Sequence, residues 1–137
     1  MALLSYDDRA GEIWFNGAFQ PWRDSKLHVL SHGLHYASAV FEGERAYDGK
    51  IFLTDEHSKR LLRSGELLDM PIPWTAEQIT AAKDEVLKAN GFSNAYVRAV
   101  AFRGAGEDMG VSSSRNPVRL FIAAWEWGSY YGDAKMK

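Results

Sequence analysis

Short stretches of alternating hydrophobic and polar residues run through the chain, and turn-forming dipeptides interrupt two of them. Asn16-Gly17 divides residues 12–22, and Asp48-Gly49 divides residues 39–54. Both dipeptides favour the two-residue turns of β-hairpins, because they accept the positive φ angles that such turns require. The pattern therefore predicts two antiparallel hairpins, with the second strand of the first one starting at Ala18.

Other segments depart from the two-residue period. Residues 24–38 have no clean period and predict a loop with one helical turn that bends at Gly33. Residues 55–70 predict a helix that runs to Pro71 and is N-capped by Thr54, with acidic residues in its first turn. The leucines expected to form its buried stripe are Leu61, Leu62, Leu67 and Leu68.

A second helix is predicted directly after the first. Thr75 and Gln78 have the spacing of a capping box, and Gly91 is a typical residue to follow a helix C-terminus. The hydrophobic residues between them follow helical spacing and are expected in the core. They are Ile79, Ala82, Val86 and Leu87.

Two more strands complete the predicted fold. Residues 94–104 and 118–128 are rich in β-branched and aromatic residues, and a glycine- and serine-rich loop over residues 104–117 joins them. The second strand is the most hydrophobic, so we expect it near the centre of the sheet. This order of strands and helices predicts an α+β fold, with a mainly antiparallel β-sheet and two adjacent helices packed on it.

Composition narrows the class of protein and of partner. The 137 residues carry a net charge of −2 and 46% hydrophobic residues, which is ordinary for one soluble domain. This balance favours neither a nucleic-acid nor a membrane partner. The chain has no cysteine, which excludes disulfides and thiolate metal sites, and its start lacks a signal-peptide pattern. We therefore expect one domain, residues 1–137, in the cytoplasm.

One candidate for ligand binding is a pair of residues on a single strand. Tyr96 and Arg98 are two residues apart, so their side chains point the same way. A phenol beside a planar guanidinium group suits a carboxylate ligand. The alternative is a surface arginine that pairs with an acid on a helix.

A second candidate lies in the stretch FEGER. Phe41, Gly43 and Arg45 share one strand face, while Glu42 and Glu44 point to the other. An aromatic wall beside a glycine suits a small-molecule pocket, because glycine weakens a strand and permits close approach to the backbone. A bulge or a close-packed sheet crossing is the alternative.

Other candidates carry weaker signals. Arg60 lies mid-helix among leucines, where it either reaches inward to a phosphate or lies on a solvated helix face. His28, His32 and His35 lack the spacing of a zinc site, so packing or hydrogen-bonding roles are expected and no metal. The loop at 104–113 lacks the Gly-Lys-Ser/Thr ending of a phosphate loop. No nucleophile–base pair stands out.

Five motifs carry a resemblance to a known family. They are SHGLHYASAVFEGERAY, EHSKRLLRS, AYVR, DMGV and AAWEWGSYYG, in this order between about Ile13 and Gly132. With them the chain resembles the N-terminal part of branched-chain amino acid aminotransferases, fold-type IV enzymes that use pyridoxal 5'-phosphate (PLP). The YxxxxFEGxR and YxR patterns separate it from the D-amino acid transaminase and aminodeoxychorismate lyase relatives.

The resemblance implies roles for individual residues. Arg60 would hold the cofactor phosphate. Tyr96 would donate to the α-carboxylate of the substrate, and Arg98 would receive the distal carboxylate of glutamate. The residues implied as walls of the side-chain pocket are Phe41, Gly43, Trp127 and Tyr130. Those implied to reach into the site of the neighbouring subunit, in a homodimer or larger homo-oligomer, are Tyr36 and Val111.

The resemblance also implies what this chain lacks. The lysine that forms a Schiff base with PLP lies in the family's second domain, beyond residue 137, so we expect a small N-terminal domain that is inactive alone. Lys135 and Lys137 are expected to be solvated tail residues, and Lys83 and Lys88 surface residues. The full-length enzyme would exchange amino groups between leucine, isoleucine or valine and 2-oxoglutarate. A D-amino acid transaminase, an aminodeoxychorismate lyase relative and a non-catalytic dimerisation or ligand-binding module are the alternatives.

Overall fold

The computed structural model describes residues 4–112 and 114–127. Its main element is one antiparallel β-sheet of six strands. Its strands are β1 (Glu12–Phe15), β2 (Ala18–Pro21), β3 (Ala39–Tyr47), β4 (Lys50–Ile51), β5 (Ala95–Arg103) and β6 (Val118–Trp125). The helical elements are η1 (Trp22–Asp24), α1 (His32–Tyr36), α2 (Thr54–Leu67) and α3 (Ala76–Asn90). No helix in the described part of the chain is long and apolar enough to cross a membrane.

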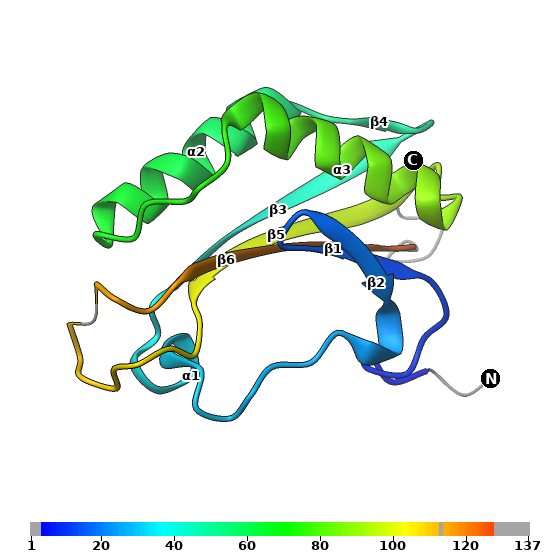
Figure 1. Ribbon diagram of the computed structural model, residues 1–137. Helices are drawn as coiled ribbons and strands as arrows, with labels where there is room; N and C mark the ends of the chain where they lie inside the picture. Colours follow the sequence, from blue (N-terminus) through cyan, green and yellow to red (C-terminus); the bar gives the residue numbers. More distant parts are fainter. Residues whose placement is uncertain (1–3, 113, 128–137) are drawn as a thin grey trace, which may run out of the picture.

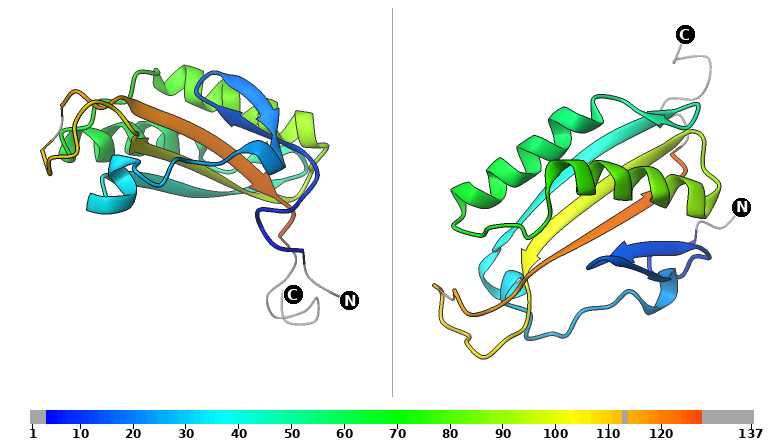
Figure 2. Two further views of the ribbon diagram at one scale, coloured as in Figure 1. Left: turned by 60° about the horizontal axis from the view of Figure 1, so that its bottom comes forward. Right: turned by 45° about the horizontal axis from the view of Figure 1, so that its top comes forward.

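The six strands are arranged in the order β2-β1-β6-β5-β3-β4, and each neighbouring pair is antiparallel. Helices α2 and α3 pack side by side on one face (Figures 1 and 2). Among the described residues no helix covers the middle of β3 and β5 on the other face, which we call the open face, while residues 22–31 and α1 run below the sheet and α1 packs on the end of β5 (Figure 1). The predicted α+β fold class is confirmed, and β6 lies between β1 and β5 as expected.

Both predicted hairpins form around positive-φ dipeptides. Asn16 and Gly17 have φ angles of 54° and 98°, and Asp48 and Gly49 have 51° and 78°. Positive φ at both positions gives a turn whose twist matches that of the strands. The returning strand β4 is shorter than predicted, because it ends at Ile51 and α2 begins three residues later.

The expected bend at Gly33 was wrong, because Gly33 lies inside α1. The chain turns at Ala37 instead, with a φ angle of 57°. A Cβ atom at Gly33 would lie 3.0 Å from the carbonyl oxygen of Ser38 and 3.3 Å from that of Arg103. The glycine therefore lets α1 pack close against the end of β5.

The N-terminus and the buried stripe of α2 differ from the prediction. Leu53, with a φ angle of 53°, is the N-cap and supplies no side-chain hydrogen bond, whereas Thr54 is the first helical residue. Leu61 is buried as predicted, but Leu67 and Leu68 are exposed. The helix ends at Leu67, so it stops short of Pro71.

Small residues explain why the leucine stripe of α2 was misplaced. Ser58 and Gly65 are the other buried residues of this helix. A Cβ atom at Gly65 would lie 2.7 Å from the carbonyl oxygen of Met70 and 3.0 Å from Ile72. The segment after the helix thus packs directly on Gly65, and Met70 fills the buried position that a leucine was expected to take.

Helix α3 begins and ends as predicted. Thr75 and Gln78 form the reciprocal capping box, and Gly91 closes the helix in the left-handed conformation. All four hydrophobic residues expected in its core stripe are buried. Lys88 is exposed as predicted, but Lys83 is fully buried, so its assignment to the surface was wrong.

The buried lysine has a partner on the sheet. Nζ of Lys83 donates to the two carboxylate oxygens of Glu44 at 2.8 and 3.0 Å, and to the carbonyl oxygen of Thr54 at 3.2 Å. Burial raises the pKa of Glu44, while the adjacent ammonium group of Lys83 acts to lower it. This ion pair joins β3 and α3 to the first residue of α2, beside a hydrophobic core that contains no other charged pair among the residues of its cluster.

Strand β3 is exposed along most of one edge. Strand β4 pairs with Ala46 and Tyr47, so in the described part of the chain residues 39–44 have no strand on that side. The predicted alternation is confirmed, since Glu42 and Glu44 are buried under the helices and Phe41 is exposed.

Candidate functional site

The two candidate sets of the sequence analysis meet on the open face of the sheet. The register of β3 and β5 places Gly43 opposite Arg98, and Arg45 opposite Tyr96. Nη2 of Arg98 donates a hydrogen bond of 2.7 Å to the hydroxyl oxygen of Tyr96. The shared orientation of Tyr96 and Arg98 is confirmed, and their polar ends form one group.

Gly43 makes this arrangement possible. A Cβ atom at position 43 would lie 2.9 Å from Cζ of Tyr96 and closer still to its hydroxyl oxygen. The space above this glycine is therefore filled by the protein's own tyrosine. A larger residue would push the phenol away from Arg98, so Gly43 sets the position of Tyr96.

Aromatic rings surround the two polar groups. The ring of Tyr96 lies 4.5 Å from that of Trp127 and 4.9 Å from that of Trp125, between ring centroids. The guanidinium carbon of Arg98 lies 4.5 Å from the ring centroid of Phe41. Sequence reasoning missed Trp125, although its two-residue spacing from Trp127 was a signal that both could share one face.

Several N–H donors on this face have no acceptor. They are Nε of Arg98, Nε of Arg45 and Nε1 of Trp125, each buried and without a hydrogen-bond partner among the described residues. Buried donors in native proteins are almost always satisfied, so such a cluster indicates an acceptor supplied by a ligand, water or another part of the protein. A carboxylate is the ligand group that suits two guanidinium groups and a phenol.

Arg60 lies on the other side of β3. Its Nε and Nη2 donate to the carboxylate of Glu42, with the shortest distances 2.8 and 2.7 Å, and Nδ1 of His57 lies 2.6 Å from the same carboxylate. Burial acts to raise the pKa of Glu42, but the hydrogen bonds from Arg60 and His57 outweigh it and leave this pKa below its ordinary value. Glu42 therefore stays ionised near neutral pH.

Arg60 and Arg98 lie on opposite faces of the sheet, with Arg60 bonded to Glu42 of β3, the strand with the free edge, and Arg98 one strand further in, on β5. Glu42 and Gly43 are adjacent in sequence and point to opposite faces, so Arg60 approaches this edge from the helix side while Arg98 lies on the open side. This edge faces outward because no described strand pairs with residues 39–44 on that side.

Two other predicted site residues lie at the far end of the sheet. Tyr36 ends α1, and its hydroxyl donates 2.7 Å to the carbonyl oxygen of Met109 in the loop that carries Val111. Val111 is 73% exposed. Helix α1 packs beside Arg103, seven residues along β5 from Tyr96, which corresponds to roughly 20 Å. The structure does not bring Tyr36 and Val111 to Tyr96 within one chain.

The remaining candidates have structural roles or cannot be placed. His32 is buried between Ser38 and the carbonyl oxygen of Gly110, at 2.7 Å from each. In the described part of the chain no group of three or more His, Asp or Glu could hold a metal ion. Tyr130, Lys135 and Lys137 lie outside the described residues.

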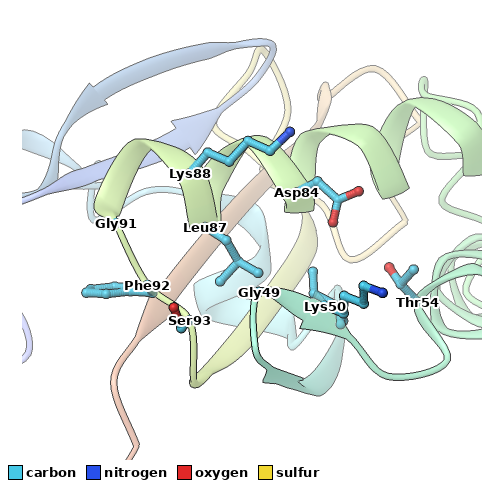
Figure 3. A pocket seen from close by; sticks show the side chains of 10 residues that line it. Gly49, Lys50, Thr54, Asp84, Leu87, Lys88, Gly91, Phe92 and Ser93 are labelled. Carbon is cyan, nitrogen blue, oxygen red and sulfur yellow. The ribbon is translucent and has the colours of Figure 1, made fainter.

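A hollow of the described surface lies in a different place from these residues. It measures about 680 Å³ and lies between β4 and the C-terminal half of α3 (Figure 3). Charged residues of both signs border it, namely Lys50, Asp84 and Lys88. It belongs to the helix-covered side of the sheet, and the one unpartnered buried group known on its lining is the neutral hydroxyl of Thr54. The open face brings two guanidinium groups and an indole N–H together, so it is the better candidate site.

Comparisons with known proteins identify the family and the fold. A family model described as Amino-transferase class IV matches residues 39–136. A branched-chain-amino-acid aminotransferase of Pseudomonas aeruginosa is 40% identical over 98% of this chain. A crystal structure of the T.th. branched-chain amino acid aminotransferase with pyridoxamine 5'-phosphate has a TM-score of 0.84 and 44% identity over 92% of this chain. The same enzyme with N-(5'-phosphopyridoxyl)-L-glutamate has a TM-score of 0.81 and 44% identity over 87% of this chain.

Each of these relatives is longer than the part of it that matches this chain. The chain spans 45% of the Pseudomonas aeruginosa protein. It spans 43% and 41% of the chains in the two crystal structures. It therefore corresponds to less than half the length of these relatives.

Proposed function

Because the chain belongs to the class IV amino-transferase family, we propose that it is the N-terminal domain of a PLP-dependent branched-chain amino acid aminotransferase. The full-length protein would exchange the amino group between leucine, isoleucine or valine and 2-oxoglutarate. The observation that carries this proposal is the hydrogen-bonded pair Tyr96–Arg98 on an aromatic sheet face with unsatisfied N–H donors.

Such an enzyme must accept two kinds of side chain in one pocket, and this face supports both. Glutamate brings a distal carboxylate, for which the guanidinium group of Arg98, beside the hydroxyl of Tyr96, offers a charged partner. Branched aliphatic side chains need apolar walls, which Phe41 and Trp127 provide, together with Tyr130 if the family pattern holds. In this proposal Tyr96 donates to the α-carboxylate, and Gly43 sets the position of its phenol.

Arg60 is the residue proposed to hold the phosphate of PLP. Its side chain is 65% exposed, and its bonds to Glu42 leave three of its five N–H groups without a hydrogen bond to that carboxylate. That arrangement fits a phosphate. When bound, PLP would supply an electron sink for the bond broken at the substrate α-carbon.

PLP chemistry requires a lysine that forms a Schiff base with the cofactor, and we propose no lysine among the described residues for this role. Lys83 is buried and paired with Glu44, so it cannot reach a ligand on the open face. We propose that this lysine follows residue 137, as in the family pattern. In that case the chain alone binds substrate groups but does not transaminate.

We also propose that the protein works as a homo-oligomer in the cytoplasm. Tyr36 and Val111 lie roughly 20 Å along the sheet from Tyr96, which suits residues that serve the site of a neighbouring subunit. The exposed hydrophobic residues at this end of the sheet suit a subunit interface; they are Leu27, Val29, Leu30, Leu34 and Val111. Light scattering of the full-length protein tests this, and a monomer at all concentrations would contradict it.

The catalytic proposal is tested with the full-length protein. We expect it to form glutamate from L-leucine and 2-oxoglutarate, and to reject D-alanine and aminodeoxychorismate. Arg98→Ala should lower kcat/KM for glutamate far more than for leucine, because only glutamate places a second charge against Arg98. The lost charge pair is worth about 2–5 kcal/mol where water is excluded. Equal losses for both substrates would contradict the role of Arg98, and activity on the D-amino acid would contradict the substrate class.

A further inference from the structure

Glu42 is a buried carboxylate to which the pocket described above gives no role. Its side chain is 4% exposed, and every hydrogen bond recorded for it comes from α2. Arg60 donates from Nε and Nη2, and His57, one turn earlier on the helix, donates from Nδ1 at 2.6 Å. The carboxylate of Glu42 thus accepts hydrogen bonds from one edge of the Arg60 guanidinium group, and His57 donates to the same carboxylate.

The geometry of the guanidinium group decides what remains for a ligand. Arginine has five N–H donors in a fixed plane, and two of them point at Glu42. Because Nδ1 of His57 carries its hydrogen toward Glu42, the 3.5 Å approach between Nη2 and this nitrogen is not a further bond. Both N–H groups of Nη1 and one of Nη2 remain, and one from each nitrogen forms the edge that can receive two oxygens of an anion.

We propose that Glu42 is a positioning residue for a phosphate site at Arg60. It fixes the plane of the guanidinium group so that the Nη1–Nη2 edge faces outward at the free edge of β3. The inference rests on the proposed function, which assigns the cofactor phosphate to Arg60. Because Glu42 is bonded covalently to Gly43, one strand also fixes the distance between the phosphate site and the carboxylate-binding group on the other face.

The negative charge of Glu42 and its role in orienting Arg60 predict opposite effects of Glu42→Gln on phosphate binding. A negative charge beside Arg60 repels a phosphate, so electrostatics alone predicts that Glu42→Gln tightens phosphate binding. If Glu42 orients Arg60, the same substitution weakens binding, because the freed guanidinium group must be ordered when the ligand binds. The sign of the change therefore separates the two explanations.

The test uses the full-length protein and three probes: inorganic phosphate, PLP and pyridoxal, which lacks the phosphate. We expect Glu42→Gln to weaken binding of phosphate and of PLP by about 10- to 100-fold, by analogy with residues that orient the ligands of a metal site. Binding of pyridoxal should not change. Arg63→Ala is the matched control, because Arg63 is an exposed arginine one turn further along α2, and it should leave binding of all three probes unchanged.

The Nε–H resonance of Arg60 gives a readout that is independent of catalysis. In the wild type it should be sharp and should shift on addition of inorganic phosphate. In Glu42→Gln it should broaden or exchange faster. Glu42→Asp serves as a second variant if Glu42→Gln does not fold, because it keeps the charge and withdraws the carboxylate by about 1.5 Å, and it should weaken phosphate binding as well.

The outcomes separate this inference from the proposed function. Unchanged or tighter phosphate binding by Glu42→Gln would overturn the positioning role, as would an equal loss for pyridoxal. A wild-type protein whose Arg60 resonance does not respond to phosphate would also overturn it. A protein that binds phosphate at Arg60 but transfers no amino group would instead overturn the proposed function and leave the role of Glu42 standing.

Discussion

Replacing Gly43 by alanine should displace Tyr96 without unfolding the sheet. The new Cβ atom would lie 2.9 Å from Cζ of Tyr96, whereas ordinary contacts begin at 3.4 Å, so the ring must move by at least the difference of 0.5 Å and its hydroxyl by more. That movement breaks the 2.7 Å hydrogen bond from Arg98. A misplacement of about 1 Å in a group that orients a substrate costs roughly 100-fold in rate.

The effect on stability should be small by comparison. Alanine is tolerated in a strand, and the ring contacts that Tyr96 makes with Trp125 and Trp127 are each worth about 0.5–1.5 kcal/mol. Partial loss of these contacts should shift the melting temperature by no more than about 4 °C. We therefore expect a large loss of kcat/KM for leucine and glutamate in a protein that melts almost normally.

A double-mutant cycle makes the test specific. In Tyr96→Phe the hydroxyl is already absent, so adding Gly43→Ala should cost much less than it does in the wild type. The assay is kcat/KM for leucine with 2-oxoglutarate in the full-length protein, measured for both single variants and the double variant. Full activity of Gly43→Ala, or strictly additive losses, would refute the claim that this glycine acts through Tyr96.

Two further predictions concern the buried acids of β3. Glu44→Gln should lower the free energy of unfolding by about 3–5 kcal/mol, because it leaves the ammonium group of Lys83 buried and unpaired. Chemical denaturation measures this loss, and the double variant Glu44→Leu/Lys83→Met should recover much of it. The pKa of Glu42 is held below its ordinary value of 4.5, so its stabilising contribution is present above pH 4.5 and is lost as the pH falls through the lower folded pKa. The difference in unfolding free energy between wild type and Glu42→Gln should therefore shrink on acidification, and a constant difference would contradict this.

Local signals in the sequence were enough for most of the fold. Asn16-Gly17 and Asp48-Gly49 form their turns because the chemistry that allows positive φ angles is contained in the dipeptides themselves. The capping box of Thr75 and Gln78 is equally local. Leu67 was misplaced because the packing of α2 depends on how closely the next segment approaches Gly65, which no periodicity reports.

The candidate site was predictable where it depends on strand geometry and not where it depends on packing between elements. The two-residue period placed Tyr96 beside Arg98, and it separated Glu42 from Gly43 correctly. It could not show that Glu42 bonds to Arg60, because that contact joins a strand to a helix. Lys83 was assigned to the surface for the same reason, since its carboxylate partner lies 39 positions earlier in the chain.

The charges on the inner face of β3 have a consequence for how the chain folds. A slip of one residue in the pairing of a strand turns every side chain to the wrong face, so a strand with one buried face has a strongly specified register. Here a slip would carry Glu42 and Glu44 onto the open face and leave Lys83 without a counter-ion in the core. The correct pairing of β3 is therefore locked only after α3 has formed, so we expect the β3–β5 pairing to appear late in refolding, together with α3.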